Sequence, residues 1–214
     1  IFYVEYGHRV LGRLIGLCFL VPLLYFFIRK TIKRHMAPSF IIMFILGGLQ
    51  GVLGWYMVNS GLVNDPLVSQ YRLTAHLSAA IAIYGYVFWV ALGFISPTPK
   101  NASVSGIQSI RNFSILITVV VAIMIISGGF VAGTRAGLAY NTFPLMAGQF
   151  FPPGLYNMEP FYLSLFEDLT TIQFNHRMIA YLLCILIPVF WFKTRVVSLS
   201  SRTRLGLNLL LLML

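Results

Sequence analysis

Five long apolar runs are the feature that most constrains the fold of this chain. Each reaches the roughly 20 residues that an α-helix needs to cross the hydrocarbon of a bilayer. They cover residues 6–28, 38–58, 73–95, 113–133 and 174–192, and a sixth run begins near residue 205. Because only helices and closed barrels satisfy every backbone polar group in lipid, the runs predict an all-α, polytopic membrane helical bundle.

The composition argues against a water-soluble enzyme or nucleic-acid binder. Of the 214 residues, 58% are apolar and 9% are charged, whereas about a quarter of the residues of soluble domains are charged. A net charge of +10 would suit nucleic acid in a polar chain. Here most lysines and arginines lie in short segments between the apolar runs, which is typical of loops that face an anionic membrane surface. The predicted partner is therefore a lipid bilayer, with no nucleic acid.

The charge map also gives the chain a predicted orientation. Basic segments at 29–34, 100–111 and 193–204 follow the first, third and fifth runs, so they mark the cytoplasmic or matrix side. The opposite, outer side carries all the acidic residues, together with arginines but no lysine. Such arginines either extend to the interface or bind carboxylates and phosphates. The map fits a bacterial inner membrane or, alternatively, a mitochondrial inner membrane.

Three of the four histidines, His8, His76 and His176, lie at the outer ends of the first, third and fifth runs. Ionisable side chains at membrane depth are costly and usually mark a site. Small residues follow two of these histidines at helical spacing: Gly12 and Gly16 after the first, Ala180 and Cys184 after the last. This row could form a flat slot for a planar macrocycle with an axial imidazole, or serve close helix packing without a ligand.

Arginines accompany each of these histidines, because Arg9 and Arg177 directly follow two of them and Arg72 lies one helical turn before the third. If the macrocycle is a heme, these guanidinium groups are candidates to bind its propionates. The site would then lie on the periplasmic or intermembrane-space side.

A weak internal repeat relates the two halves of the chain. Glu5-Tyr-Gly-His8-Arg9 recurs as Gln173-Phe-Asn-His176-Arg177. A carboxylate near an iron ligand can move protons or stabilise a cation, whereas a carboxamide cannot. We therefore expect a chemical pocket in the first half and a cofactor-holding pocket in the second. The alternative is that Glu5 only pairs with Arg9 four residues on.

The outer segment from residue 134 to residue 172 is long for a connection between helices and rich in proline and aromatic residues. This composition predicts a lid that lies at the membrane interface over the pockets. Glycine-rich stretches at 47–54 and 128–133 predict tight helix packing rather than a phosphate loop.

Five segments of the chain match one family in its order: residues 5–13, 48–55 with 60–62, 71–77, 129–146 and 173–177. Together they resemble the heme A synthases, membrane enzymes that convert heme O to heme A for cytochrome c oxidase. The resemblance implies eight helices in two pseudo-symmetric four-helix halves. This chain would hold the second helix to the start of the seventh, as a fragment with an N-terminal half at 1–98 and a C-terminal half at 99–214.

The resemblance also implies roles for the candidate residues. His8 and His76 would bind the iron of the substrate heme O, and Glu5 would be catalytic. His176 would bind the iron of a heme b cofactor, with a partner histidine on a helix that this chain lacks. The implied reaction oxidises a ring methyl to a formyl group through hydroxylation with oxygen from water. Because this sequence has no pair of outer-loop cysteines, it resembles the branch of the family without that pair.

Other functions remain open from the sequence. The main alternative is a non-catalytic diheme b-type cytochrome that passes electrons to or from quinone. A heme-handling protein of cytochrome c assembly and a purely structural subunit are further alternatives. The partners that the resemblance suggests are an electron acceptor, heme O synthase, cytochrome c oxidase assembly factors and further copies of the chain.

Overall fold

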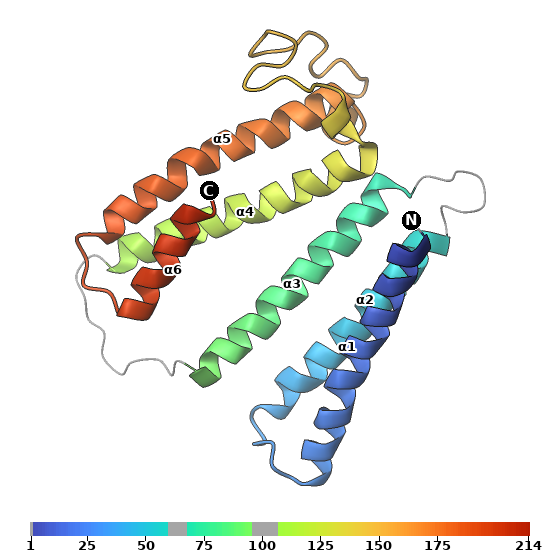
Figure 1. Cartoon of the computed structure of the whole chain (residues 1–214), viewed down its shortest axis with the longest axis vertical. Coiled ribbons are helices and arrows are strands. Elements are labelled where there is room, and N and C mark those ends of the chain that lie inside the picture. Colours follow the sequence, from blue (N-terminus) through green and yellow to red (C-terminus); the bar gives the residue numbers. More distant parts are fainter. Residues whose placement is uncertain (1, 60–67, 96–106) are drawn as a thin grey trace. The chain divides into compact units, whose positions relative to one another are not determined.

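The computed structural model describes residues 2–59, 68–95 and 107–214, and within these ranges it is helical and has no strand (Figure 1). Its α-helices are α1 (Phe2–Ile28), α2 (Ala37–Asn59), α3 (Gln70–Ile95), α4 (Ile107–Thr134), α5 (Leu169–Thr194) and α6 (Ser201–Leu212). Two short 3-10 helices, η1 (Ala136–Leu138) and η2 (Phe161–Leu165), lie between α4 and α5. The residues 60–62 of the family pattern and Lys100 of the basic segments lie outside the described residues.

Five helices, α1 to α5, are long and apolar enough to cross a membrane, which confirms the predicted polytopic helical bundle. The largest differences from the predicted bounds are at the starts of α4 and α5, which begin at residues 107 and 169 rather than 113 and 174. Both early turns contain polar residues such as Gln108 and Thr170. Hydropathy finds the part of a helix that spans lipid, whereas backbone hydrogen bonds continue into the polar turns beyond it.

The start of α5 is fixed by a side-chain cap. The Asp168 carboxylate accepts a hydrogen bond from the Thr171 backbone N–H at 2.9 Å and another from the Thr171 hydroxyl. An N-cap of this kind typically stabilises a helix by about 1 kcal/mol. Because the cap defines where α5 begins, it also fixes the register of the turns that carry Gln173, His176 and Arg177.

The chain divides into two compact units. The first consists of Ile1–Arg72 and Ala79–Thr98, and the second of Leu73–Ser78 and Pro99–Leu214. The short stretch of α3 that carries His76 is therefore grouped with the second unit. The predicted boundary at residues 98 and 99 lies outside the described residues, and the pseudo-symmetric half-bundles stay a prediction.

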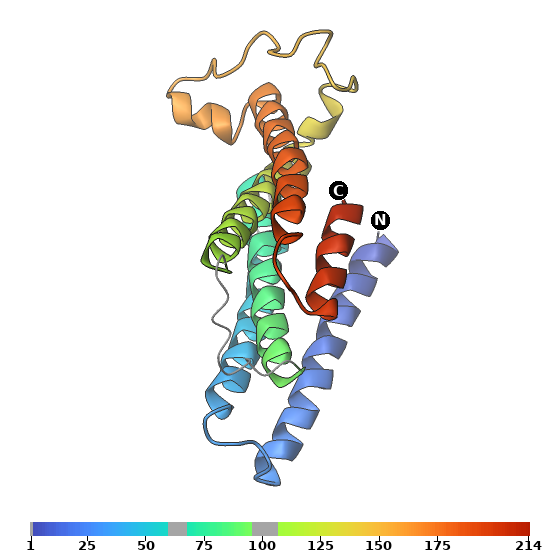
Figure 2. The ribbon, with the colours of Figure 1, turned by 90° about the vertical axis from the view of Figure 1, so that its left-hand side faces the viewer.

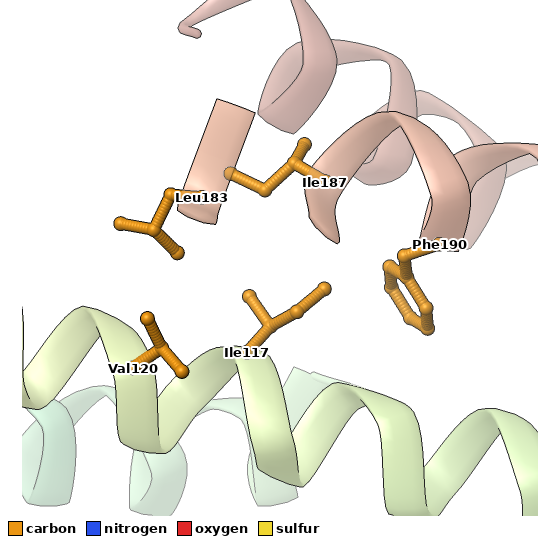
Figure 3. Close-up of a cluster of buried hydrophobic side chains, with 5 residues drawn as sticks. All are labelled: Ile117, Val120, Leu183, Ile187 and Phe190. Atoms are coloured by element: carbon orange, nitrogen blue, oxygen red, sulfur yellow. The ribbon is translucent and has the colours of Figure 1, made fainter. Parts of the chain in front are cut away.

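The core of the second unit lies between α4 and α5. Apolar side chains from one face of each helix meet there (Figure 3): Ile117, Val120, Leu183, Ile187 and Phe190. Their spacing of three or four residues along each helix is that of a single helical face. The Phe113 and Phe190 rings stack at 5.4 Å between centroids. These contacts hold α5 against α4 and so help to position the end of α5 that carries His176.

Candidate functional site

His176 is half-buried on α5 and contacts α4 through its ring. Its Nδ1 lies 2.8 Å from the Ser127 hydroxyl oxygen, which is also 2.9 Å from the Met124 carbonyl oxygen. A Cβ atom at Gly128 would lie only 3.2 Å from Cε1 of the ring. The glycine therefore lets the imidazole approach the backbone of α4 more closely than a larger residue would allow.

The adjacent Gly129 serves a second close approach. A Cβ atom there would lie 2.8 Å from the Thr74 hydroxyl oxygen and 3.1 Å from the Thr74 Cα, distances that a side chain cannot occupy. Thr74 is buried, at 5% exposure, two residues before the candidate ligand His76. The paired glycines of α4 thus provide the tight packing that their sequence pattern predicts.

Gln173 is buried one turn before His176 and holds the outer segment by both ends of its amide. Its Oε1 accepts a hydrogen bond from the Tyr140 backbone N–H at 3.1 Å, and its Nε2 donates to the Tyr140 carbonyl at 2.9 Å. The side chain pairs with Tyr140 as one peptide group pairs with another. This arrangement requires a donor and an acceptor in the same side chain, which a carboxylate cannot supply.

Arg177 holds the same segment from the next position on α5. Its guanidinium donates to the carbonyl oxygens of Thr142 at 2.7 Å, Tyr140 at 2.9 Å and Leu145 at 3.5 Å. These bonds use three of the five N–H donors of an arginine. The structure thus places this predicted propionate ligand against the backbone of the outer segment, and its contact with a propionate stays a prediction.

Other side chains of α5 complete this attachment. The Tyr181 hydroxyl donates to the Pro144 carbonyl at 3.0 Å, and the Tyr156 hydroxyl donates to Asn175 Oδ1 at 2.7 Å. Figures 1 and 2 show the segment, residues 135–168, lying beyond the outer end of α5. It is therefore folded onto the end of the helix that carries His176. Its role as a lid over the pockets stays a prediction.

The first histidine motif differs from the second. Glu5, His8 and Arg9 lie on α1 and are exposed. Among the residues that the structure describes, Glu5 forms no ion pair with Arg9. The interpretation in which the carboxylate only neutralises that arginine therefore finds no support in this conformation.

The remaining candidate residues lie on α3. The Arg72 guanidinium stacks over the Tyr56 ring of α2 at 4.7 Å from the ring centroid, a cation–π contact. His76 is half-buried. Because His8 and His76 belong to different units of the chain, their pairing on one heme iron stays a prediction.

Sequence reasoning missed two parts of this site. One is Ser127, although a serine beside paired glycines in an apolar run is itself a signal. The other is Tyr181, whose spacing of four residues from Arg177, itself four residues after Gln173, puts all three on one face of α5. The sequence places them together, but their backbone acceptors in the outer segment become visible only once that segment is folded.

Comparisons with known proteins place these features in a family context. The COX15-CtaA family, described as "Cytochrome oxidase assembly protein", matches residues 1–214. A protein of Nitrosospira multiformis named heme A synthase is 55% identical over 214 residues, covering 100% of this chain and 60% of that protein. The heme A synthase of Nitrosomonas eutropha is 51% identical, again over 100% of this chain and 60% of the relative.

A more distant relative has the same name. The heme A synthase of Parvibaculum lavamentivorans is 45% identical over 91% of this chain and 56% of its own length. The chain thus spans about 60% of the length of its more similar relatives. No solved structure matches it.

Proposed function

We propose that this chain, which belongs to the COX15-CtaA family of cytochrome oxidase assembly proteins, is part of a heme A synthase. The enzyme would oxidise a ring methyl of heme O to a formyl group and so produce heme A for cytochrome c oxidase. The observation that carries this proposal is the 55% identity over the full chain to a protein with that name. The two unequal histidine motifs on α1 and α5 support it.

The first motif would carry out the chemistry. His8 and His76 would hold the iron of heme O as the substrate. Glu5 precedes His8 by three residues on α1, so both lie on one face of the helix. Each hydroxylation of the methyl takes oxygen from water and releases two electrons and two protons. The Glu5 carboxylate would accept a proton or stabilise the cation that forms at the ring methyl.

The second motif would hold the heme b cofactor through His176. The residues present fit this group, because the half-buried imidazole is oriented through one ring nitrogen and has a glycine beside it. When bound, heme b supplies an acceptor for the electrons that leave the substrate. A second histidine that holds heme b would come from a part of the protein outside this chain. Arg9, Arg72 and Arg177 are candidates to bind the propionates of the two hemes.

The proposed location is the inner membrane of a bacterium, with the histidines on the periplasmic side. The basic segments on the opposite side support this orientation, although a mitochondrial inner membrane would give the same charge map. Heme O synthase, an electron acceptor and cytochrome c oxidase assembly factors are the proposed partners. Assembly into a homo-oligomer is compatible with this arrangement.

The test uses the complete gene in cells that make heme O but no heme A. Pigments are extracted and identified by chromatography with mass detection. Appearance of heme A, or of its hydroxylated precursor, is the expected result. Unchanged heme O together with a b-type spectrum of the purified protein would contradict the proposal and favour a diheme electron-transfer cytochrome.

A further inference from the structure

The hydroxyl of Ser127 is shared between two groups of different chemistry. It lies 2.9 Å from the Met124 carbonyl oxygen and 2.8 Å from His176 Nδ1. A serine hydroxyl has one proton to donate, and a carbonyl oxygen can only accept. When the proton points to Met124, the hydroxyl oxygen must accept the second bond from an N–H at Nδ1.

With the hydroxyl proton directed to Met124, His176 carries a proton on Nδ1. A neutral imidazole with its proton on Nδ1 has the lone pair on Nε2, which is the nitrogen that remains able to bind a metal. A ligating histidine usually donates its other ring N–H to a carboxylate, a carbonyl or water, and that bond sets the ring orientation. The Ser127 hydroxyl occupies this place for His176.

The surroundings of the ring hold it beside Ser127. Gly128 lets the imidazole lie close against α4, because a Cβ atom there would be 3.2 Å from Cε1. The two helices are held together by their core, in which Ile117 and Val120 of α4 pack against the facing side chains of α5. Ser127 and His176 are therefore held at hydrogen-bond distance by the packing of two helices.

We propose that Ser127 is a positioning residue for the heme b ligand His176. Its hydroxyl accepts the Nδ1–H bond, so that Nε2 is deprotonated and the ring is oriented before the cofactor binds. The inference rests on the proposed function only in naming heme b as the group that His176 binds. Ser127 itself touches neither the substrate nor the iron.

The hydrogen bond has a consequence for the iron. An imidazole that donates its Nδ1–H is a more basic ligand, and a more basic ligand favours the oxidised iron. Removing the acceptor should therefore raise the midpoint potential of the heme and weaken its retention. The loss of such an outer partner typically lowers metal affinity by about 10–100-fold.

The experiment compares variants of the full-length protein, purified with its heme. Ser127→Ala should raise the midpoint potential of heme b and speed its loss to apomyoglobin by about 10-fold or more. Ser127→Thr keeps a hydroxyl and should restore both values toward those of the wild type. The matched control is Ser114→Ala on the same helix, because that hydroxyl donates to the Arg111 carbonyl at 2.8 Å and is exposed. It should change neither value.

Two results would overturn the inference. One is a Ser127→Ala protein with the potential and heme retention of the wild type. The other is an equal loss of heme in Ser127→Ala and Ser127→Thr, which would indicate a packing defect rather than a lost acceptor. The readouts do not depend on heme A. A protein that shows the Ser127 effect but makes no heme A would contradict the proposed function alone.

Discussion

The two histidine motifs share a spacing but differ in what surrounds them. On α5, Gln173 is buried and pairs with Tyr140, and Arg177 binds three backbone carbonyls of the outer segment. On α1, the matching residues Glu5 and Arg9 are exposed. The second motif uses its polar side chains to hold the outer segment, whereas the carboxylate of the first motif is exposed, and its part in the chemistry is our proposal.

The structure thus explains why residue 173, which matches Glu5 in the repeat, is a glutamine. A glutamine at 173 satisfies both the N–H and the carbonyl of Tyr140. A carboxylate there would bring two acceptors within hydrogen-bond distance of each other in a buried place, which is unfavourable. The sequence alone indicates only that the carboxamide of Gln173 cannot act as an acid. The fold shows that this carboxamide binds the backbone of Tyr140.

The largest expected effect comes from removing the acid of the first motif. In the full-length protein, Glu5→Gln should lower the rate of heme A formation by about 100-fold or more, because a positioned acid or base commonly contributes that much. The measurement is heme A per cell in a strain that supplies heme O. Glu159→Gln, in the outer segment, is the control, and unimpaired heme A formation in Glu5→Gln would remove the acid role.

The next effect should come from placing an acid in the second motif. Gln173→Glu leaves the Tyr140 carbonyl facing an acceptor, and we expect a loss of about 1–3 kcal/mol in the stability of the outer segment. Hydrogen exchange of the amides at 140–147 should become faster. The control is Gln108→Glu on α4, where the side chain is exposed and donates to Asn112 at 2.9 Å. Equal exchange in both variants would contradict the role of Gln173.

Replacing the guanidinium by an ammonium should have a smaller effect. Arg177→Lys loses the fork that binds separate carbonyl groups, so we expect a loss of about 1–2 kcal/mol in the attachment of the outer segment. Exchange at 140–147 should again report it. Arg9→Lys on α1 is the matched control and should leave these amides unchanged. A shift in the heme b potential without faster exchange would instead assign Arg177 to a propionate.

The smallest effect should follow from Tyr181→Phe. The variant loses one hydrogen bond to the Pro144 carbonyl, which is worth about 1 kcal/mol, and keeps the contact between the rings of Phe143 and Tyr181. Protease cleavage within the outer segment should become slightly faster. Tyr84→Phe on α3, whose side chain is largely exposed, should not change it. Identical cleavage in the two variants would remove Tyr181 from this attachment.

Much of the fold follows from the sequence because the bilayer imposes a simple rule on helix length. The apolar runs predict the membrane helices, and the places where they fail, at the starts of α4 and α5, are polar turns capped or extended by local hydrogen bonds. The candidate histidines also follow from the sequence, since ionisable residues are rare in such helices.

The contacts of the site could not be predicted in the same way. Gln173 and Arg177 bind backbone groups 32 to 37 residues away in the chain. A backbone donor or acceptor has no signature in the sequence. Ser127 meets His176 at a place where Gly128 lets the ring approach the backbone of α4. This contact depends on how α4 packs against α5. Many apolar sequences would allow such packing, so the apolar pattern does not predict the contact.

The central claim is that the first motif performs the chemistry and the second holds a cofactor. The most direct test is the heme composition of the full-length protein and its Glu5→Gln and Gln173→Glu variants, purified from cells that make heme O. The account predicts that Glu5→Gln contains a normal amount of heme b with unconverted heme O, whereas Gln173→Glu contains less heme b. Equal loss of heme b in both variants, or heme A at the wild-type level in Glu5→Gln, would contradict it.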